Sequence, residues 1–168
     1  MRRYIVLVAI VASVVCLGIL ACSQETPVTE EMIPKAVKDA LLARFPTAEI
    51  GRATRAKEGG AIVYDVEFKE GDRKCEADIR EDGSYINYEK AIAPSDLPEA
   101  IRQAIEERYP ESTLKEAMEE TEVRGKEERL SAYEVTITTT NDKEAEVRVS
   151  AQGKILEDSG AKKPKNKN

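Results

Sequence analysis

Two stretches of the chain repeat one another, and this internal repeat limits the fold more than any other feature of the sequence. The segment 33–46 reappears as 97–110, with both prolines, both alanines and an arginine at matching positions. Further along, the pattern of 64–68 returns at 133–137, after a short insertion in the second copy. A chain of 168 residues that repeats itself in this way is expected to build one small unit twice.

Each copy is predicted to begin with a helix. In the first copy the apolar residues Ile33, Val37 and Leu41 recur at the spacing of one helical face, and the second copy keeps this spacing. Pro34 lies in the first turn, where its missing N–H is not needed. Pro46 disfavours helical geometry in the residue before it, so the helix is expected to stop there, and the second copy has the same pair of prolines.

The rest of each copy alternates apolar and polar residues, as strands with one buried and one solvated face do. Glycine-containing turns at 81–84 and 151–154 separate the last two strands of each copy. The strands are expected at 48–58, 62–69, 75–79 and 85–88 in the first copy and at 112–123, 133–138, 145–149 and 154–157 in the second.

These patterns predict an α+β fold of two tandem repeats, each a helix followed by a four-stranded antiparallel sheet. Because a unit of roughly 60 residues buries only a marginal core, we expect the two half-sheets to join or pack over a shared core, with both helices packed on one face of the sheet. The predicted boundaries are a signal peptide at 1–21, a lipidated cysteine and tether at 22–31, repeats at 32–91 and 92–159, and a disordered basic tail at 160–168.

The N-terminus has the pattern of an export signal. Arg2 and Arg3 precede an uncharged apolar run that ends at Ala21. The cysteine that follows makes this order resemble a bacterial lipobox, which implies a lipid anchor on Cys22. An uncleaved membrane helix is the alternative, since the run is about long enough to span a bilayer. Both interpretations tether the remaining chain to a membrane of the cell envelope, facing the periplasm or the exterior.

The charge of the chain argues against nucleic acid as a partner. The formal net charge is −6, and the body between the leader arginines and the tail lysines is more acidic still. Such a body repels phosphate backbones. The lysine-rich tail is expected to be a solvated end rather than a DNA-binding arm.

The sequence also argues against catalysis. The chain contains no histidine, which removes the commonest general base and metal ligand and excludes Ser–His and Cys–His triads. No phosphate loop or paired-cysteine zinc spacing occurs. We therefore predict no catalytic residue, no metal and no cofactor. Glu67 and Glu76 could form an acid–base pair but are interpreted as solubilising charge, and Cys75 is interpreted as a small buried residue rather than a reactive thiol.

Cation binding is a second functional class that the sequence leaves open. Asp78, Glu81, Asp82 and Ser84 gather oxygen ligands near a turn, and hard cations prefer such ligands. Their spacing does not match an EF-hand loop, and the second copy has Arg148 at the position of Asp78.

The order Ile/Leu-Pro-x-Ala, Phe/Tyr-Pro, Tyr-acid-Val and a glycine turn, over residues 32–158, resembles the PepSY-like repeats of bacterial envelope proteins. Tandem copies of this kind also resemble the β-lactamase inhibitor protein fold. The resemblance implies a non-enzymatic module that binds an unidentified envelope protein or peptide, with inhibition of a peptidase or similar hydrolase as the usual suggestion. The inhibitor proteins carry disulfides, whereas Cys75 has no partner in the body of this chain.

The polar face of the sheet is the predicted partner surface, although any half-buried sheet needs a solvated side. A structural or sensory lipoprotein without inhibitory action is the alternative function, and the sequence does not indicate an oligomeric state. The insertion at 121–129 is either a recognition loop at a hairpin tip or a tolerated surface insertion. The candidate contact residues are Asp65, Glu67, Glu76, Asp78, Glu134, Thr136, Thr138, Glu146 and Arg148.

Overall fold

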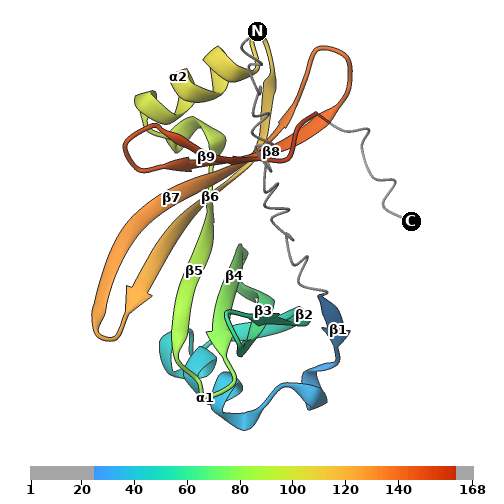
Figure 1. Ribbon diagram of the computed structural model, residues 1–168, viewed down its shortest axis with the longest axis vertical. Helices are drawn as coiled ribbons and strands as arrows, with labels where there is room; N and C mark the ends of the chain where they lie inside the picture. Colours follow the sequence, from blue (N-terminus) through green and yellow to red (C-terminus); the bar gives the residue numbers. More distant parts are fainter. Residues whose placement is uncertain (1–24, 162–168) are drawn as a thin grey trace, which may run out of the picture.

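The computed structural model describes residues 25–161, which form one antiparallel sheet of nine strands and two α-helices. The strands lie across the sheet in the order in which they occur in the chain (Figure 1). They are β1 (Thr26–Val28), β2 (Ala48–Glu58), β3 (Ala61–Glu70), β4 (Arg73–Arg80), β5 (Tyr85–Ile92), β6 (Thr113–Arg124), β7 (Glu127–Thr138), β8 (Glu144–Ser150) and β9 (Ile155–Asp158). The predicted signal peptide, Cys22 and the tail lysines lie outside the described residues.

The predicted fold class, two tandem α+β repeats that each pair a helix with four strands, is wrong. In that arrangement β5 ends the first repeat and β6 begins the second, yet the two strands pair from Asn87–Glu122 to Ile92–Ala117. Two separate half-sheets would each leave an edge of unpaired backbone groups, and pairing satisfies both edges. The described part of the protein is therefore mainly one continuous β-sheet with two short α-helices.

The two helices begin and end where the prolines predict. α1 (Lys35–Arg44) starts directly after Pro34, and α2 (Glu99–Arg108) starts directly after Pro98. At the end of α1, the N–H of Phe45 donates to the carbonyl oxygen of Leu41 at 2.8 Å, and Pro46 follows. Short 3-10 turns at Glu30–Met32 and Pro94–Asp96 precede the helices. In the part of the chain from 25 to 161, no helix has the length and apolar character needed to cross a membrane.

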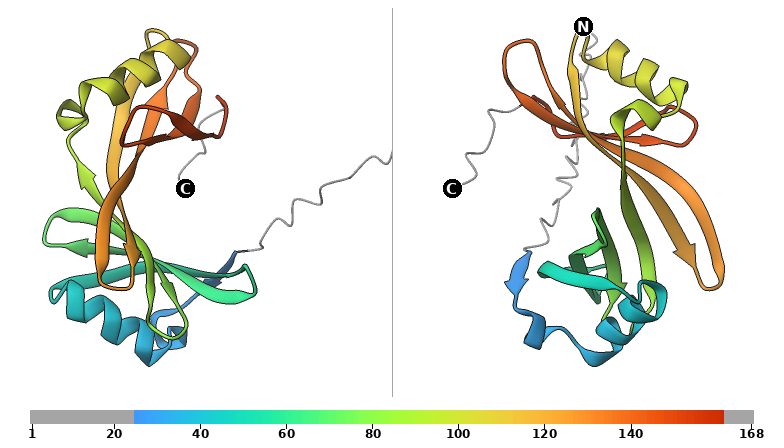
Figure 2. Two further views of the ribbon diagram at one scale, coloured as in Figure 1. Left: turned by 60° about the vertical axis from the view of Figure 1, so that its left-hand side comes forward. Right: turned by 180° about the vertical axis from the view of Figure 1, so that it is seen from behind.

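The expected shared core is divided into two hydrophobic clusters, one under each helix. In the first half of the molecule (residues 25–92), α1 buries Val37 and Leu41 against β3 and β4. In the second half (93–161), α2 buries Ile101 and Ile105 against β7 and β8. The sheet is strongly curved and twisted, and both helices lie on its outer side (Figure 2). No helix within residues 25–161 lies on its concave side (Figure 2).

Two segments, the predicted tether and the insertion interpreted as a hairpin-tip loop or a surface insertion, contain strands that the sequence did not predict. Residues 26–28, inside the predicted tether, pair with β2 as β1. The insertion at 121–129 is no loop, because it forms the paired ends of β6 and β7, which close in a tight turn with Gly125 at φ 64°. The insertion therefore lengthens a hairpin, which projects from the second half toward the first (Figure 1).

Candidate binding surface

Acidic side chains stand directly opposite one another on the concave face of the sheet. The backbone register pairs Glu67 with Glu76, Glu76 with Glu89, and Glu89 with Glu120, so that one row of glutamates crosses β3, β4, β5 and β6. We call these four residues the glutamate row. Like charges at directly opposed positions destabilise an antiparallel sheet. The row therefore needs either compensating cations or bound protons.

Compensation within the glutamate row is uneven. Glu67 accepts a hydrogen bond from Arg52 Nε at 2.9 Å, and Glu76 lies 2.8 Å from Lys74 Nζ. Glu89 has no such partner among the described residues: its Oε2 atom is buried and accepts no hydrogen bond. The centre of the sheet thus holds a carboxyl group that neither an arginine nor a lysine neutralises.

Glu120, at the end of the row, is the best-partnered carboxylate of the face. Its side chain is 4% exposed and lies 2.5 Å from Arg148 Nε and 2.7 Å from Arg148 Nη2. Ser131 Oγ donates to it as well, at 2.7 Å. Burial alone would raise the pKa of Glu120, but the hydrogen bonds from Arg148 and Ser131 outweigh burial and lower it. Arg148 is also 3.1 Å from Glu157 on β9.

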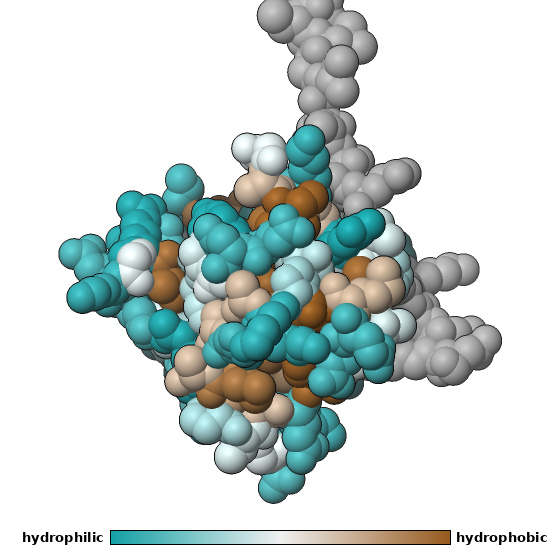
Figure 3. Space-filling view, turned by 90° about the horizontal axis from the view of Figure 1, so that it is seen from below, coloured by the Kyte–Doolittle hydropathy of each residue, from teal (hydrophilic) through white to brown (hydrophobic). Residues whose placement is uncertain are grey.

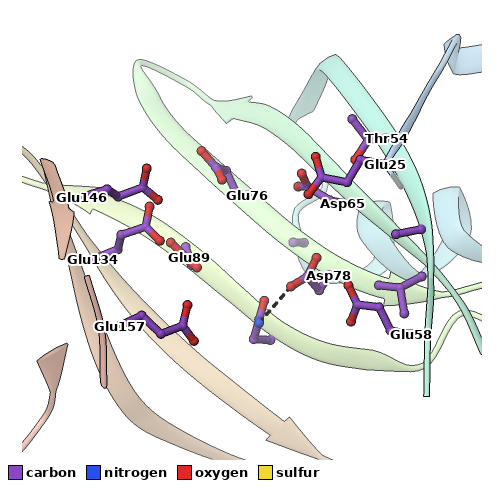
Figure 4. Close-up of a pocket in the computed structure, with 14 residues that line it drawn as sticks. Glu25, Thr54, Glu58, Asp65, Glu76, Asp78, Glu89, Glu134, Glu146 and Glu157 are labelled. Atoms are coloured by element: carbon purple, nitrogen blue, oxygen red, sulfur yellow. Dashed lines mark hydrogen bonds between the residues drawn. The ribbon is translucent and has the colours of Figure 1, made fainter. Parts of the chain in front are cut away.

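A cleft of about 390 Å³ opens on this face between the two halves of the molecule (Figure 4). Asp65, Glu76 and Asp78 line it from the first half, while Glu134 and Glu146 line it from the second. We call it the acidic cleft, because no lysine or arginine is among the described residues that line it. The other lining residues are Glu25, Thr54, Ala56, Glu58, Val63, Ala77, Asn87, Glu89 and Glu157.

The cleft favours the protonated form of several of its carboxyl groups. Burial, followed by the charge of Asp78, raises the pKa of Asp65 to about 7. Burial, followed by the charge of Glu76, raises the pKa of Glu89 to about 8. For Glu134, burial and then the charge of Glu89 raise the pKa to about 8. Each shift follows from taking a carboxylate out of water while surrounding it with others.

The cation site considered from the sequence does not assemble near the turn at 81–84. Asp82 Oδ1 accepts hydrogen bonds from the backbone N–H and the hydroxyl of Ser84, at 2.9 and 2.6 Å. Asp78 lies on β4, where Asn87 donates to it at 3.0 Å. Within residues 25–161, no group of three or more acidic, cysteine or histidine side chains has the geometry to hold a metal ion.

The structure gathers only part of the predicted contact set into the cleft. Of the nine predicted residues, Asp65, Glu76, Asp78, Glu134 and Glu146 line it. Glu67, Thr136, Thr138 and Arg148 do not. Cys75 is free and buried in the first hydrophobic cluster, as predicted.

Sequence reasoning missed Glu89, which lies at the centre of the face. The expected strand ends at Tyr88, whereas β5 continues to Ile92. Glu89 is two residues after Asn87, so the alternation of the strand would have placed it on the polar face had the strand been extended. Glu120 was missed because the first strand of each copy, which is β6 in the second, has a weaker apolar–polar alternation than the strands that follow it.

Apolar side chains offer no comparable surface on the side of the molecule seen in Figure 3. That view from the α1 end shows a mainly hydrophilic surface with small separate apolar areas. The large apolar residues that are exposed, Met32, Leu42, Leu130 and Leu156, lie on separate elements of the described chain.

Solved structures with a similar fold come from Bacteroides. A BLIP-like protein from Bacteroides fragilis has a TM-score of 0.53 and 18% identity, covering 80% of this chain and 91% of its own. A structure described as "putative periplasmic proteins" from Bacteroides eggerthii has a TM-score of 0.57 and 13% identity, covering 74% of this chain and 86% of its own. At such identities the likeness concerns the fold alone. No curated protein sequence matches this chain.

The amino-acid sequence matches the model of a known protein family. The model of the family described as "Putative beta-lactamase-inhibitor-like, PepSY-like" matches residues 62–157. The match runs from β3 to β9 and includes most of the carboxyl groups of the acidic cleft. Because it spans more than half of the chain, the protein belongs to this PepSY-like family.

Proposed function

We propose that this protein is a non-enzymatic binding protein of the cell envelope, and that its acidic cleft contacts a positively charged segment of a protein or peptide partner. The observation that carries this proposal is the composition of the cleft: carboxyl groups from both halves converge on it, and the described lining residues include no cation. A guanidinium or ammonium group placed there would relieve the repulsion between the carboxylates.

Three features support a role in binding rather than in catalysis. The chain has no histidine, and Cys75, its free thiol in the described part, is buried. The fold resembles that of a BLIP-like protein. The envelope location rests on the N-terminal export pattern, and it agrees with the description of a structural neighbour as periplasmic. Inhibition of a hydrolase remains one form that such binding could take.

A matched pair of charge reversals tests this proposal. Glu146 is an exposed residue of the cleft, and Glu107 is an exposed residue of α2 on the opposite side of the sheet. Glu146→Lys and Glu107→Lys change the net charge equally. The full chain and both variants are used as bait in envelope extract, and a carboxyl-to-amine cross-linker maps which glutamates contact the captured protein.

The wild-type chain and Glu107→Lys are expected to retain the same partner, whereas Glu146→Lys loses it. Because exposed ionic contacts are screened by salt, retention should also fall as ionic strength rises. Equal retention by the two variants, or cross-links confined to the helix side, would refute the assignment of the cleft. If the captured partner is a hydrolase, its activity with and without the bait decides between inhibition and simple attachment.

A further inference from the structure

Glu89 occupies a position that is unfavourable for a charged carboxylate. Glutamates face it from both neighbouring strands, Glu76 on β4 and Glu120 on β6. Its Oε2 atom is buried and has no hydrogen-bond partner. An ionised oxygen there would lose its hydration without gaining a donor, which costs far more than burying a neutral carboxyl group. The geometry therefore favours a proton on Glu89.

Glu134 leads to the same conclusion from the other half of the molecule. It projects from β7 into the cleft, on the side of Glu89 (Figure 4). Glu146 on the neighbouring strand β8 lines the same cleft, and its negative charge contributes to the raised pKa of Glu134. An ionised Glu134 would therefore lie beside the carboxyl groups of both Glu89 and Glu146 in a partly buried cleft, which favours a proton on Glu134.

The groups around these two residues are almost all acidic. Arg148, the cation that faces Glu89, is held by Glu120 and Glu157. The charged groups that face Glu89 are Glu76 and Asp78 on β4, Glu120 on β6, Glu134 on β7 and Arg148 on β8. Those that face Glu134 are Glu76, Glu89 and Glu146, together with Arg148, which lies opposite Glu134 in the register of β7 and β8.

We propose that Glu89 and Glu134 hold protons at neutral pH and release them on mild alkalisation, so that the acidic face works as a proton-operated switch on the pairing of β5 with β6. Among the described residues, this pairing joins the sheets of the two halves. Loss of the protons places new negative charge on Glu89 of β5 and Glu134 of β7, on either side of this pairing, next to carboxylates that are already ionised. Ionisation therefore loosens the junction, and protonation tightens it.

The sign of the effect on stability follows from the direction of the shifts. The pKa of Glu89 and that of Glu134 are each raised in the folded protein from 4.5 to about 8. The protons they bind thus stabilise the fold fully below a pH of about 4.5, and this contribution is lost as the pH rises through about 8. Stability should decline between about pH 6 and pH 9, where exposed carboxyl groups are already ionised.

Thermal unfolding of the full chain at about pH 6 and pH 9 tests the proposal without any partner, so its outcome is independent of the proposed function. The variants are Glu89→Gln, Glu134→Gln and their combination, with Glu107→Gln on the exposed side of α2 as the matched control. The wild type and the control are expected to lose roughly 5 °C or more of melting temperature at the higher pH. The double variant should lose less than half as much.

Carboxyl NMR titration of the wild-type chain keeps the test decisive if a variant fails to fold. At least two side-chain carboxyl groups should titrate above a pH of about 7, and their signals should be absent from the double variant. The proposal is overturned if every carboxyl group titrates below a pH of about 6, or if the wild type and the folded double variant lose the same melting temperature.

Discussion

Arg44 Nη1 lies 2.5 Å from Glu128 Oε1, and this ion pair joins the last residue of α1 to the tip of the β6–β7 hairpin. The hydroxyl of Tyr88 on β5 donates to the other oxygen of Glu128 at 2.9 Å. The Arg44 guanidinium also lies over the rings of Tyr85 and Tyr88, at 4.7 and 5.0 Å from their centres. The lengthened hairpin thus holds the second half of the molecule against the first.

We expect this contact to be worth more than an ordinary surface ion pair. A double-mutant cycle with Arg44→Met and Glu128→Gln, measured by chemical denaturation, should give a coupling free energy of about 1 kcal/mol or more, because ring contacts and the Tyr88 hydroxyl support the pair. The control is the exposed pair of Lys35 and Asp39 on α1. Its coupling should be roughly 0.3–0.5 kcal/mol. Equal couplings would contradict this interpretation of the hairpin.

The division of the core predicts additive effects across the two halves. Leu41 and Ile105 are both fully buried, in different hydrophobic clusters. Truncation of either to alanine should cost about 2–5 kcal/mol of unfolding free energy. Since the two sites share no cluster, the double variant should equal the sum within about 0.5 kcal/mol. For comparison, Leu41 and Val66 lie in the same cluster. The loss of unfolding free energy in the Leu41→Ala/Val66→Ala double variant should therefore differ from the sum of the two single losses. A strong coupling between Leu41 and Ile105 would argue for one common core.

Gly83 is required where the turn between β4 and β5 meets α1. Its φ is +88°, and a Cβ atom would lie 2.8 Å from the carbonyl oxygen of Ala36. Gly59, in the turn between β2 and β3, also has positive φ, but a Cβ atom there would meet no other atom within 4 Å. Gly59→Ala should therefore cost about 1–2 kcal/mol from backbone strain alone. Gly83→Ala should cost clearly more in the same denaturation experiment, and similar losses would show that the turn can move away from α1.

Glu120 is expected to contribute to the loss of folding stability at acidic pH. Its pKa is lowered in the folded protein, so the stability it contributes is present above about 4.5 and is lost as the pH falls through its lowered pKa. Glu120→Gln weakens the hydrogen bonds from Arg148 and should cost roughly 1–3 kcal/mol at neutral pH. The unfolding free energy of the Glu120→Gln variant should vary less with pH in the acid range than that of the wild type. Glu122→Gln, which removes the ionic partner of exposed Arg124 and Arg129, should cost clearly less than Glu120→Gln in the same measurement, because solvent screens exposed ion pairs.

Substitution of Cys22 tests the expected lipid anchor. If it is lipidated, the mature chain should begin at a modified cysteine and fractionate with membranes. Cys22→Ser should then abolish the modification, as intact mass and fractionation would reveal, whereas Cys16→Ser should not. If residues 1–21 instead remain attached as a membrane helix, the Cys22→Ser protein should keep these residues, as intact mass would show. It should also still fractionate with membranes.

Local patterns predicted the elements of the fold better than their assembly. The proline pairs located both helices, and the alternation in β3 and β7 placed Asp65 and Glu134 on the polar face. Joining of the two half-sheets was one of two alternatives left open, and the pairing of β5 with β6 as the junction was not predicted, because the alternation within a strand does not indicate which other strand pairs with it. β1 was missed for a related reason, since its three residues owe their conformation to pairing with β2 rather than to a pattern of their own.

The cleft shows the same limit at the level of single residues. An acidic side chain on a polar strand face looks like ordinary solubilising charge until its neighbours across the sheet are known. Register sets Glu89 between Glu76 and Glu120, and curvature brings Glu134 toward it. Neither the strand register nor the curvature of the sheet can be predicted from composition. The raised pKa values of Glu89 and Glu134 therefore become apparent only from the structure.

The uninterrupted order of the strands has a consequence for how the chain acquires its structure. Each strand lies beside the strand that precedes it in the sequence, so each pairing can close as soon as its own hairpin or short connection has formed. Relative contact order is therefore low for a protein built mainly of β-strands, and low contact order goes with rapid folding. Successive hairpins can add to a growing edge without waiting for distant parts of the polypeptide to meet.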